Sequence, residues 1–187
     1  MEQIPFPNKK YQIIYADPPW LYKCGKNRLA KKSMINGKDD IQYDSMEIND
    51  MKQLKVNDIA DDDCLIFMWI TSPFLEIGIN LLCEWGFKFS TVAFIWNKQR
   101  INPGSYTLSE CELCIVAKKG KIPRPRGSRK ERQFLNEMRT MHSKKPDEIR
   151  NRIERMFPEQ NKIELFAREK TEGWDVWGNE VESDIEL

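Results

Sequence analysis

The sequence predicts an α/β fold with a mostly parallel sheet and helices on both faces. Short apolar runs rich in β-branched and aromatic residues alternate along the chain with segments whose apolar residues recur at helical spacing. One of these runs, Cys64–Ile70, is apolar almost throughout, which is typical of a strand buried on both faces. Because strands and helices alternate in this way, a parallel sheet between two helical layers is favoured.

Length and composition fit one domain covering residues 1–187. A chain of 187 residues with 40% hydrophobic and 32% charged residues can bury a sizeable core but is too short for two comfortable domains. A net charge of +1 gives the protein no overall electrostatic attraction to nucleic acid, so any basic surface must be local. No apolar run approaches a membrane span, and no signal peptide is apparent. The five cysteines lack a disulfide framework, so we expect reduced thiols and a cytoplasmic protein.

The first predicted strand covers residues 11–16 and ends at Asp17-Pro18-Pro19-Trp20. Two prolines cannot continue a strand, and an Asp-Pro turn is the simplest structural interpretation of this tetrapeptide. The next segment, about 21–45, is polar and basic with little periodicity, and we expect a flexible loop there. A short helix is expected over about 47–54.

The middle of the chain is predicted to hold three strands and a helix. Residues 64–70 form the first of these strands. Ser72 and Pro73 then supply an N-cap and a proline at the first helical position, and the helix ends at a glycine. Two further strands are expected over residues 87–96 and 111–119.

A second flexible basic loop is expected over about 118–140. Residues 118–132 of this loop contain eight Lys and Arg residues and a single acid, Glu131. A solvated loop and a phosphate-contacting arm are both compatible with this composition, and the sequence leaves the choice open. Cys111 and Cys114 form a CxxC inside the preceding strand, but without a second pair we expect packed thiols and no metal site.

The last part of the chain is predicted as a helix followed by two strands. Pro146 opens the helix with acids in its first turn. The strands are expected over residues 162–167 and 174–177. Ligands of parallel sheets bind at the carboxyl ends of strands, so Asp17 and Arg168 are expected at one edge of the sheet.

The residues after the first strand suit an enzyme that binds an amino group attached to a flat aromatic ring. The nitrogen of such a group is a weak nucleophile because its lone pair is delocalised into the ring. The Asp17 carboxylate and the Pro18 carbonyl could accept its two hydrogens, aim the lone pair and stabilise developing positive charge. Proline at positions 18 and 19 fixes φ and removes competing donors, and Trp20 offers a face for stacking.

The chain resembles the MT-A family, which is named for a seventy-kilodalton subunit and contains S-adenosylmethionine-dependent adenine methyltransferases. The similarity runs from about Tyr11 to Glu180. It rests on several motifs in family order: Tyr15–Trp20, Tyr43–Met46, Leu65–Thr71, His142–Glu148, Ile163–Arg168, Gly173–Trp174 and Trp177–Asn179.

The resemblance implies a Rossmann-like class I methyltransferase fold in permuted order, with the catalytic motif before the cofactor strand, Ile163–Ala167. It implies that Lys145 and Arg168 anchor the amino-acid and ribose parts of S-adenosylmethionine. For His142 and Ser143 a capping role is an equal alternative. The implied cofactor-binding set is Asp17, His142, Ser143, Lys145, Glu164, Phe166, Arg168, Asn179 and Glu180. The implied set on the target-base side is Trp20, Tyr43 and Glu112.

The resulting hypothesis is an enzyme that methylates the N6 amino group of adenine in nucleic acid. DNA is favoured over RNA because the compact chain shows no separate recognition domain. A non-catalytic nucleic-acid-binding subunit of the same fold is a second hypothesis, which the intact Asp17 disfavours. Methylation of cytosine is a third, which Trp20 disfavours by analogy. A homodimer or a partner subunit is left open.

Overall fold

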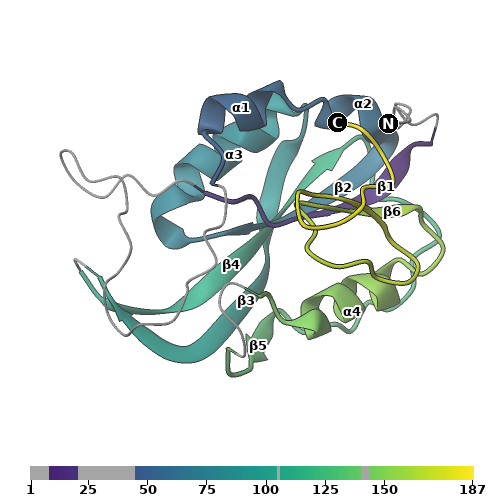
Figure 1. Ribbon diagram of the computed structural model, residues 1–187. Coiled ribbons are helices and arrows are strands. Elements are labelled where there is room, and N and C mark those ends of the chain that lie inside the picture. The colour runs from purple at the N-terminus through teal and green to yellow at the C-terminus, as the bar shows by residue number, and fades with distance from the viewer. Residues whose placement is uncertain (1–8, 21–44, 105, 140–143) are drawn as a thin grey trace.

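The computed structural model describes residues 9–20, 45–104, 106–139 and 144–187 (Figure 1). Within these ranges the chain forms seven strands. They are β1 (Tyr11–Ala16), β2 (Ala60–Ile70), β3 (Lys88–Pro103), β4 (Leu108–Lys119), β5 (Phe134–Asn136), β6 (Lys162–Leu165) and β7 (Asp175–Trp177).

The seven strands form one sheet in the order β5-β3-β4-β2-β1-β6-β7. β4 pairs antiparallel with β2 and β3, whereas the other four pairings are parallel. Of the described strands, β4 therefore runs in one direction and the remaining six in the other. The mostly parallel sheet expected from the sequence is confirmed.

Helices lie on both faces of the sheet, as expected (Figure 1). They are α1 (Ile48–Gln53), α2 (Val56–Ile59), the 3-10 helix η1 (Ser72–Phe74), α3 (Leu75–Glu84) and α4 (Asp147–Met156). Helices α1, α2 and α3 cover one face, where Ile14, Ile66 and Met68 join the same buried core as Leu81 and Leu82. Helix α4 covers the other face, where its Ile149 and Ile153 join a second core with Ile13, Leu65 and Phe67. No helix in the described part of the chain is long and apolar enough to span a membrane.

Several element boundaries differ from the sequence predictions for local reasons. The strand predicted over 87–96 continues to Pro103 because its far end pairs with the start of β4, beyond a register shift after Asn97. The strand predicted over 162–167 ends at Leu165, because Phe166 has a φ of 61°. The N-cap predicted at Ser72 is wrong. This residue begins η1, whose N-cap is Thr71 without a side-chain capping bond.

The short strand β5 was not predicted, since it lies inside the segment interpreted as a basic loop. It pairs with β3 over three residues, from Ile95 with Phe134 to Asn97 with Asn136. A three-residue strand at the edge of a sheet has too little apolar periodicity to be recognised in the sequence.

Candidate active site

Asp17 lies at the carboxyl end of β1, where three parallel strands end side by side. Ala16, the last residue of β1, is in register with Met68 of β2 and with Leu165 of β6. The Asp17 side chain is 21% exposed, so its carboxylate is partly accessible at this edge. This edge is where open parallel sheets place their ligands.

The two prolines after Asp17 form a tight turn whose carbonyls are held by the backbone. The Trp20 N–H donates to the Pro18 carbonyl at 2.9 Å, and the Met46 N–H donates to the Pro19 carbonyl at 3.0 Å. A carbonyl oxygen has two lone pairs, so that of Pro18 can accept a second hydrogen bond from a ligand. The turn therefore offers a fixed acceptor next to the Asp17 carboxylate.

Trp20 lies in a largely apolar pocket beside this turn. Its ring stacks on Phe74, with the ring centroids 5.6 Å apart and the planes at 24°. Its indole N–H donates to the Trp69 carbonyl at 3.4 Å. The pocket has a volume of about 350 Å³ and is lined by Trp20, Met46, Glu47, Ile48, Asn49, Met51, Phe74 and Ile77. A flat ring can be held in a pocket of this composition.

Four side chains of alternating charge run across the same edge of the sheet. Lys98 of β3 contacts Glu112 of β4 at 2.9 Å, measured from Nζ to Oε1. Lys145, two residues before α4, contacts the other oxygen of Glu112 at 3.4 Å. The Lys145 ammonium also donates to Asp17 Oδ2 at 2.8 Å. A lysine, a glutamate, a second lysine and an aspartate thus form a continuous chain of ion pairs.

Burial and pairing set the pKa values within this chain. Glu112 and Lys145 are 16% and 14% exposed, so both charges are largely removed from water. Burial raises the pKa of Glu112, but Lys145 and Lys98 together outweigh burial and hold it below its usual value. Burial lowers the pKa of Lys145, but Asp17 and Glu112 outweigh it and the net shift is upward. The pairing therefore favours the charged forms of both groups.

Trp69 and Lys98 belong to this site and were missed by the sequence analysis. The Lys145 ammonium lies 5.7 Å from the centre of the Trp69 ring. The Trp69 indole N–H donates to the Tyr15 hydroxyl at 2.5 Å, and this hydrogen bond fixes the orientation of the ring. Lys98 could have been found, because it follows a predicted strand at the same edge as Asp17. Trp69 carried no signal, since a tryptophan in an apolar strand is normally core.

Glu164, a predicted cofactor-binding residue, faces α4. Arg150 of α4 contacts both of its carboxylate oxygens, with Nε 2.9 Å from Oε2 and Nη2 3.3 Å from Oε1. Burial raises the pKa of Glu164 and this pairing opposes it. A glutamate in an apolar strand is costly unless paired, and Arg150 supplies the pairing. A role for Glu164 at the cofactor stays a prediction.

The ends of β6 and β7 bring the other predicted cofactor residues together. The Phe166 ring meets Trp177 edge-on, with the centroids 5.3 Å apart. Arg168 and Glu180 lie 3.7 Å apart, from Nε to Oε1, with side chains 30% and 47% exposed. Glycine at position 178 allows the residues after β7 to lie close to those after β6, because a Cβ there would lie 2.2 Å from the Ala167 carbonyl oxygen.

The predicted site residues thus fall into two groups and a remainder. Asp17, Glu112 and Lys145 are in direct contact, whereas Arg168 and Glu180 meet each other at the ends of β6 and β7. Asn179 is exposed beside Glu180. Three predicted residues, Tyr43, His142 and Ser143, lie outside the described residues.

Metal ligands and disulfides do not feature in the described part of the site. No group of three or more His, Cys, Asp or Glu residues that could hold a metal ion occurs in the described ranges. Cys114 is buried and Cys111 half-buried, both as free thiols. The packed thiols expected from the CxxC spacing are therefore confirmed.

Comparison with known proteins assigns the chain to a family. Residues 11–180 match the family model MT-A70. The chain belongs to the MT-A70 family. The fold of this MT-A70 methyltransferase is Rossmann-like, with the Asp17 strand beside the later strand β6 at the centre of the sheet. This arrangement agrees with the permuted order that the resemblance implied.

The relatives of this MT-A70 chain include a bacterial protein and several eukaryotic ones. It is 48% identical over 185 residues to the Type II methyltransferase M.MunI of Mycoplasma sp, covering 94% of the chain and 79% of that protein. It is 31% identical to an N(6)-adenosine-methyltransferase MT-A70-like protein of Drosophila melanogaster. It is 29% identical to the N(6)-adenosine-methyltransferase catalytic subunit METTL3 of Homo sapiens. The chain spans only 27% and 28% of these two eukaryotic proteins.

Proposed function

We propose that this chain transfers a methyl group from S-adenosylmethionine to the N6 amino group of adenine in nucleic acid. The observation that carries the proposal is the Asp17 carboxylate, partly exposed at the carboxyl edge of the sheet and held by Lys145 at 2.8 Å. The relatives named N(6)-adenosine-methyltransferases support adenine N6 as the target. DNA is favoured over RNA because the 48% identical relative is a Type II methyltransferase.

Asp17 and Pro18 supply the two acceptors that an exocyclic amine needs. Lys145 contacts Oδ2 of Asp17, and no described residue donates a hydrogen bond to Oδ1. Oδ1 and the Pro18 carbonyl are then available to accept the two amino hydrogens. Such hydrogen bonds pyramidalise the nitrogen and aim its lone pair, and the carboxylate stabilises the positive charge that develops on it. Fixing the amine in this way lowers the entropic part of the barrier.

The reaction balances without a further reactant. S-adenosylmethionine supplies a methyl group on a positively charged sulfur, which keeps the electron pair when the carbon–sulfur bond breaks. The amine nitrogen forms the new bond to the methyl carbon and then releases a proton. Asp17 lies within reach of that proton.

The residues at the ends of β1, β6 and β7 fit this cofactor chemically. Lys145 is a cation at the carboxyl edge of the sheet and can pair with an amino-acid carboxylate. Glu180 and Asn179 are exposed and polar, and they suit ribose hydroxyls. Arg168 and Glu180 lie 3.7 Å apart with side chains that are 30% and 47% exposed, so both are accessible from the edge where the cofactor is proposed. His142 and Ser143 remain proposed members of this set.

Adenine must leave the base stack to reach Asp17. The pocket of Trp20, Met46 and Phe74 lies directly beside the Asp17 turn and can receive an unstacked ring. We therefore expect single-stranded or flipped adenine as the reacting form. Tyr43 and Glu112 are proposed on this side of the site as well.

A single assay tests the proposal. The protein is incubated with labelled S-adenosylmethionine and with DNA or RNA oligonucleotides, which are digested so that mass spectrometry identifies the modified base. N6-methyladenine in DNA is the expected product. Matched oligonucleotides in which adenine is replaced serve as the control. Modified cytosine would show the third hypothesis to be right, and nucleic-acid binding without any methylation would favour the non-catalytic subunit.

A further inference from the structure

The loop from Gly120 to Gln133 begins at the edge of the sheet opposite Asp17 and returns to β3, where Gln133 accepts a hydrogen bond from the Ile95 N–H. β4 runs against its neighbours, so it starts near Glu112 at the catalytic edge and ends at Lys119 on the other side. The strand between these two residues spans about 24 Å. The part of the loop that Gly127 and Ser128 hold at the end of α4 is therefore remote from the proposed methyl-transfer site, and its basic residues need a separate explanation.

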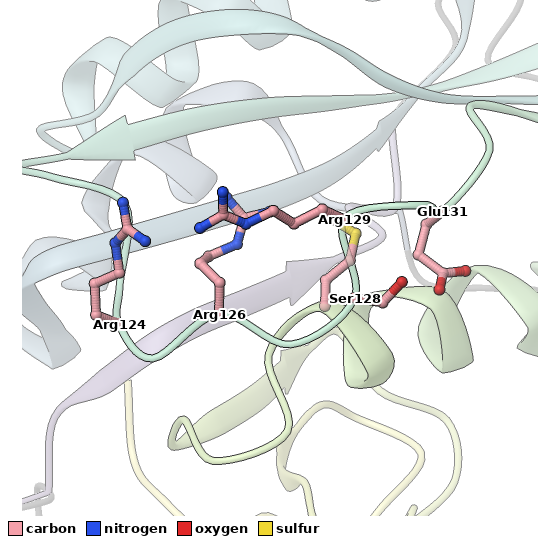
Figure 2. Close-up of a pocket in the computed structure, with 6 residues that line it drawn as sticks. Arg124, Arg126, Ser128, Arg129 and Glu131 are labelled. Carbon is pink, nitrogen blue, oxygen red and sulfur yellow. The ribbon is translucent and has the colours of Figure 1, made fainter.

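Three arginines of this loop line one pocket beside the end of α4 (Figure 2). In this view the Arg129 side chain extends toward that of Arg126, and Arg124 stands on the other side of Arg126 (Figure 2). The pocket has a volume of about 230 Å³ and is lined by Arg124, Arg126, Ser128, Arg129, Glu131 and Met156. A cluster of planar cations around a small cavity suits a phosphate group.

Within the described part of the chain, no acid forms an ion pair with the three arginines of this pocket. Glu131, its one acid, is held by Arg155, with distances of 3.1 and 2.7 Å to its two oxygens. The Arg126 Nε is buried and has no hydrogen-bond partner. Burial, Arg129 and Arg124 all lower the pKa of the Arg126 guanidinium. An anion between the arginines would offset this repulsion.

The backbone fixes the loop in this shape without a ligand. Gly127 and Ser128 donate to the last carbonyls of α4, at 3.0 Å to Met156 and 2.7 Å to Arg155. The Gln160 amide donates to the Pro125 carbonyl at 2.9 Å. A Cβ at Gly127 would lie 2.3 Å from the Arg155 carbonyl oxygen, so only glycine permits the approach. A preorganised cluster binds an anion more tightly than a flexible loop would.

A larger apolar pocket adjoins the arginine pocket and shares Arg126, Glu131 and Met156 with it. Its volume is about 470 Å³. Its lining is mostly apolar and includes Val92, Ala93 and Phe94 of β3, Val116 of β4, and Ile122 of the loop. The Arg126 guanidinium lies 4.8 Å from the Phe157 ring centre, which holds its plane at the boundary between the two pockets. A flat ring can stack on such a plane.

We propose that the two pockets form a second nucleotide-binding site, with a phosphate on Arg124, Arg126 and Arg129 and a base in the apolar pocket. The three arginines favour an anionic ligand. The adjoining apolar pocket favours an anion that also carries a flat ring. The Ser90 and Thr91 side chains at this pocket can bond to a base edge. A free nucleotide and a nucleotide unit of a strand share this chemistry. The inference goes beyond methyl transfer and does not depend on it.

Calorimetry with small ligands tests the site. Adenosine 5′-monophosphate, ribose 5-phosphate and adenosine are titrated into the protein with S-adenosylhomocysteine in excess, so that the proposed cofactor site does not contribute. We expect the monophosphate to bind more tightly than either part. Arg124→Gln with Arg129→Gln should weaken its binding at least tenfold. Lys121→Gln with Lys130→Gln removes the same charge from the same loop and should change binding less than twofold.

A second variant separates the base from the phosphate. Ala93→Leu fills the apolar pocket, so it should weaken binding of the monophosphate and leave ribose 5-phosphate unchanged. Competition with a short single-stranded oligonucleotide then identifies the source. Displacement of the monophosphate indicates a unit of a strand, and no displacement indicates a free nucleotide.

Three results would overturn the proposal. One is the absence of saturable monophosphate binding by the wild-type chain. Another is equal weakening in the two charge variants, which would mean general attraction. The third is a dimer in light scattering that becomes monomeric on Ala93→Leu, since the groove would then be a protein interface. None of these results would affect detection of a methylated base, so this inference and the proposed function fail separately.

Discussion

The charged side chains at the two edges of the sheet are arranged in opposite ways. At the carboxyl edge, Lys98, Glu112, Lys145 and Asp17 alternate in sign, and each touches a partner at 2.8–3.4 Å. At the amino edge, Arg124, Arg126 and Arg129 have one sign, and the only acid in their pocket is bound to Arg155. Alternating charges hold one another in place before any ligand arrives. Charges of one sign repel one another, so an anion stabilises them.

The largest effect on activity is expected from replacing Asp17 at the carboxyl edge. Asp17→Ala removes one of the two proposed acceptors for the amine, and kcat should fall by about 10²- to 10³-fold or more. Affinity for S-adenosylmethionine should remain within a fewfold of wild type. Asp62→Ala, an exposed acid on β2, is the matched control and should keep full activity. Methylation at the wild-type rate by Asp17→Ala would refute the proposed function.

The next largest effect is expected at Lys145. Lys145→Met leaves two largely buried carboxylates facing each other, with Lys98 as the remaining cation. Breaking a buried pair of this kind should lower the free energy of unfolding by about 3 kcal/mol. Affinity for S-adenosylmethionine should fall more than tenfold in calorimetry.

The neighbouring residue Lys144 is a matched control for this variant. Lys144 pairs with Glu169 at 3.0 Å, and both side chains are more exposed, at 30% and 53%. Exposed pairs contribute little, so Lys144→Met should change stability by less than about 1 kcal/mol. Equal effects in the two lysine variants would contradict the distinction between them.

A smaller effect is expected in the pH dependence of stability. The pKa of Glu112 is held below its ordinary value of 4.5, so the stability it contributes is present above that value and is lost as the pH falls through the folded pKa. Glu112→Gln should therefore flatten the loss of stability below pH 4.5, by about 1 kcal/mol. Urea titrations measure this, with exposed Glu110→Gln as control. A steeper acid loss in Glu112→Gln would show the sign to be wrong.

The smallest effect is expected at the amino edge and has the opposite direction. Without a ligand, Arg124→Gln with Arg129→Gln removes like-charge repulsion and should raise stability at low salt by a few tenths of a kcal/mol. Adding phosphate should raise the Tm of the wild type but not that of the variant. Lower stability of the variant without ligand would mean that the end of α4 needs these cations. The contrast between the two edges would then disappear.

More of the functional residues at the carboxyl edge than at the amino edge could be located from the sequence. A buried strand that ends in an acid indicates a ligand edge, and this rule located Asp17 before the structure. Lys98 could have been located by position, because it follows a predicted strand that ends at Trp96 at the same edge of the sheet. The contact of Glu112 with Lys145 joins residues 33 positions apart, and strand register decides it rather than local pattern.

The amino edge was harder to predict because its order depends on tertiary contacts. The arginine-rich segment has no periodicity, so the sequence leaves open whether it is a solvated loop or a phosphate-contacting arm. Gly127 and Ser128 order it by bonding to the end of α4, which begins at Asp147. β5 forms for the same reason, through its pairing with β3. These contacts also place Arg126 over Phe157, and nothing in the sequence indicates that pairing.

The reversed direction of β4 has a consequence for how this scaffold can be altered. A connection after a strand that runs with the others begins at the catalytic edge, so a change in its length disturbs the reacting groups. The connection after β4 begins about 24 Å away from Glu112. An insertion near the start of this connection should therefore leave the reacting groups in place, whereas its end returns to β3, where Phe134 pairs with Ile95.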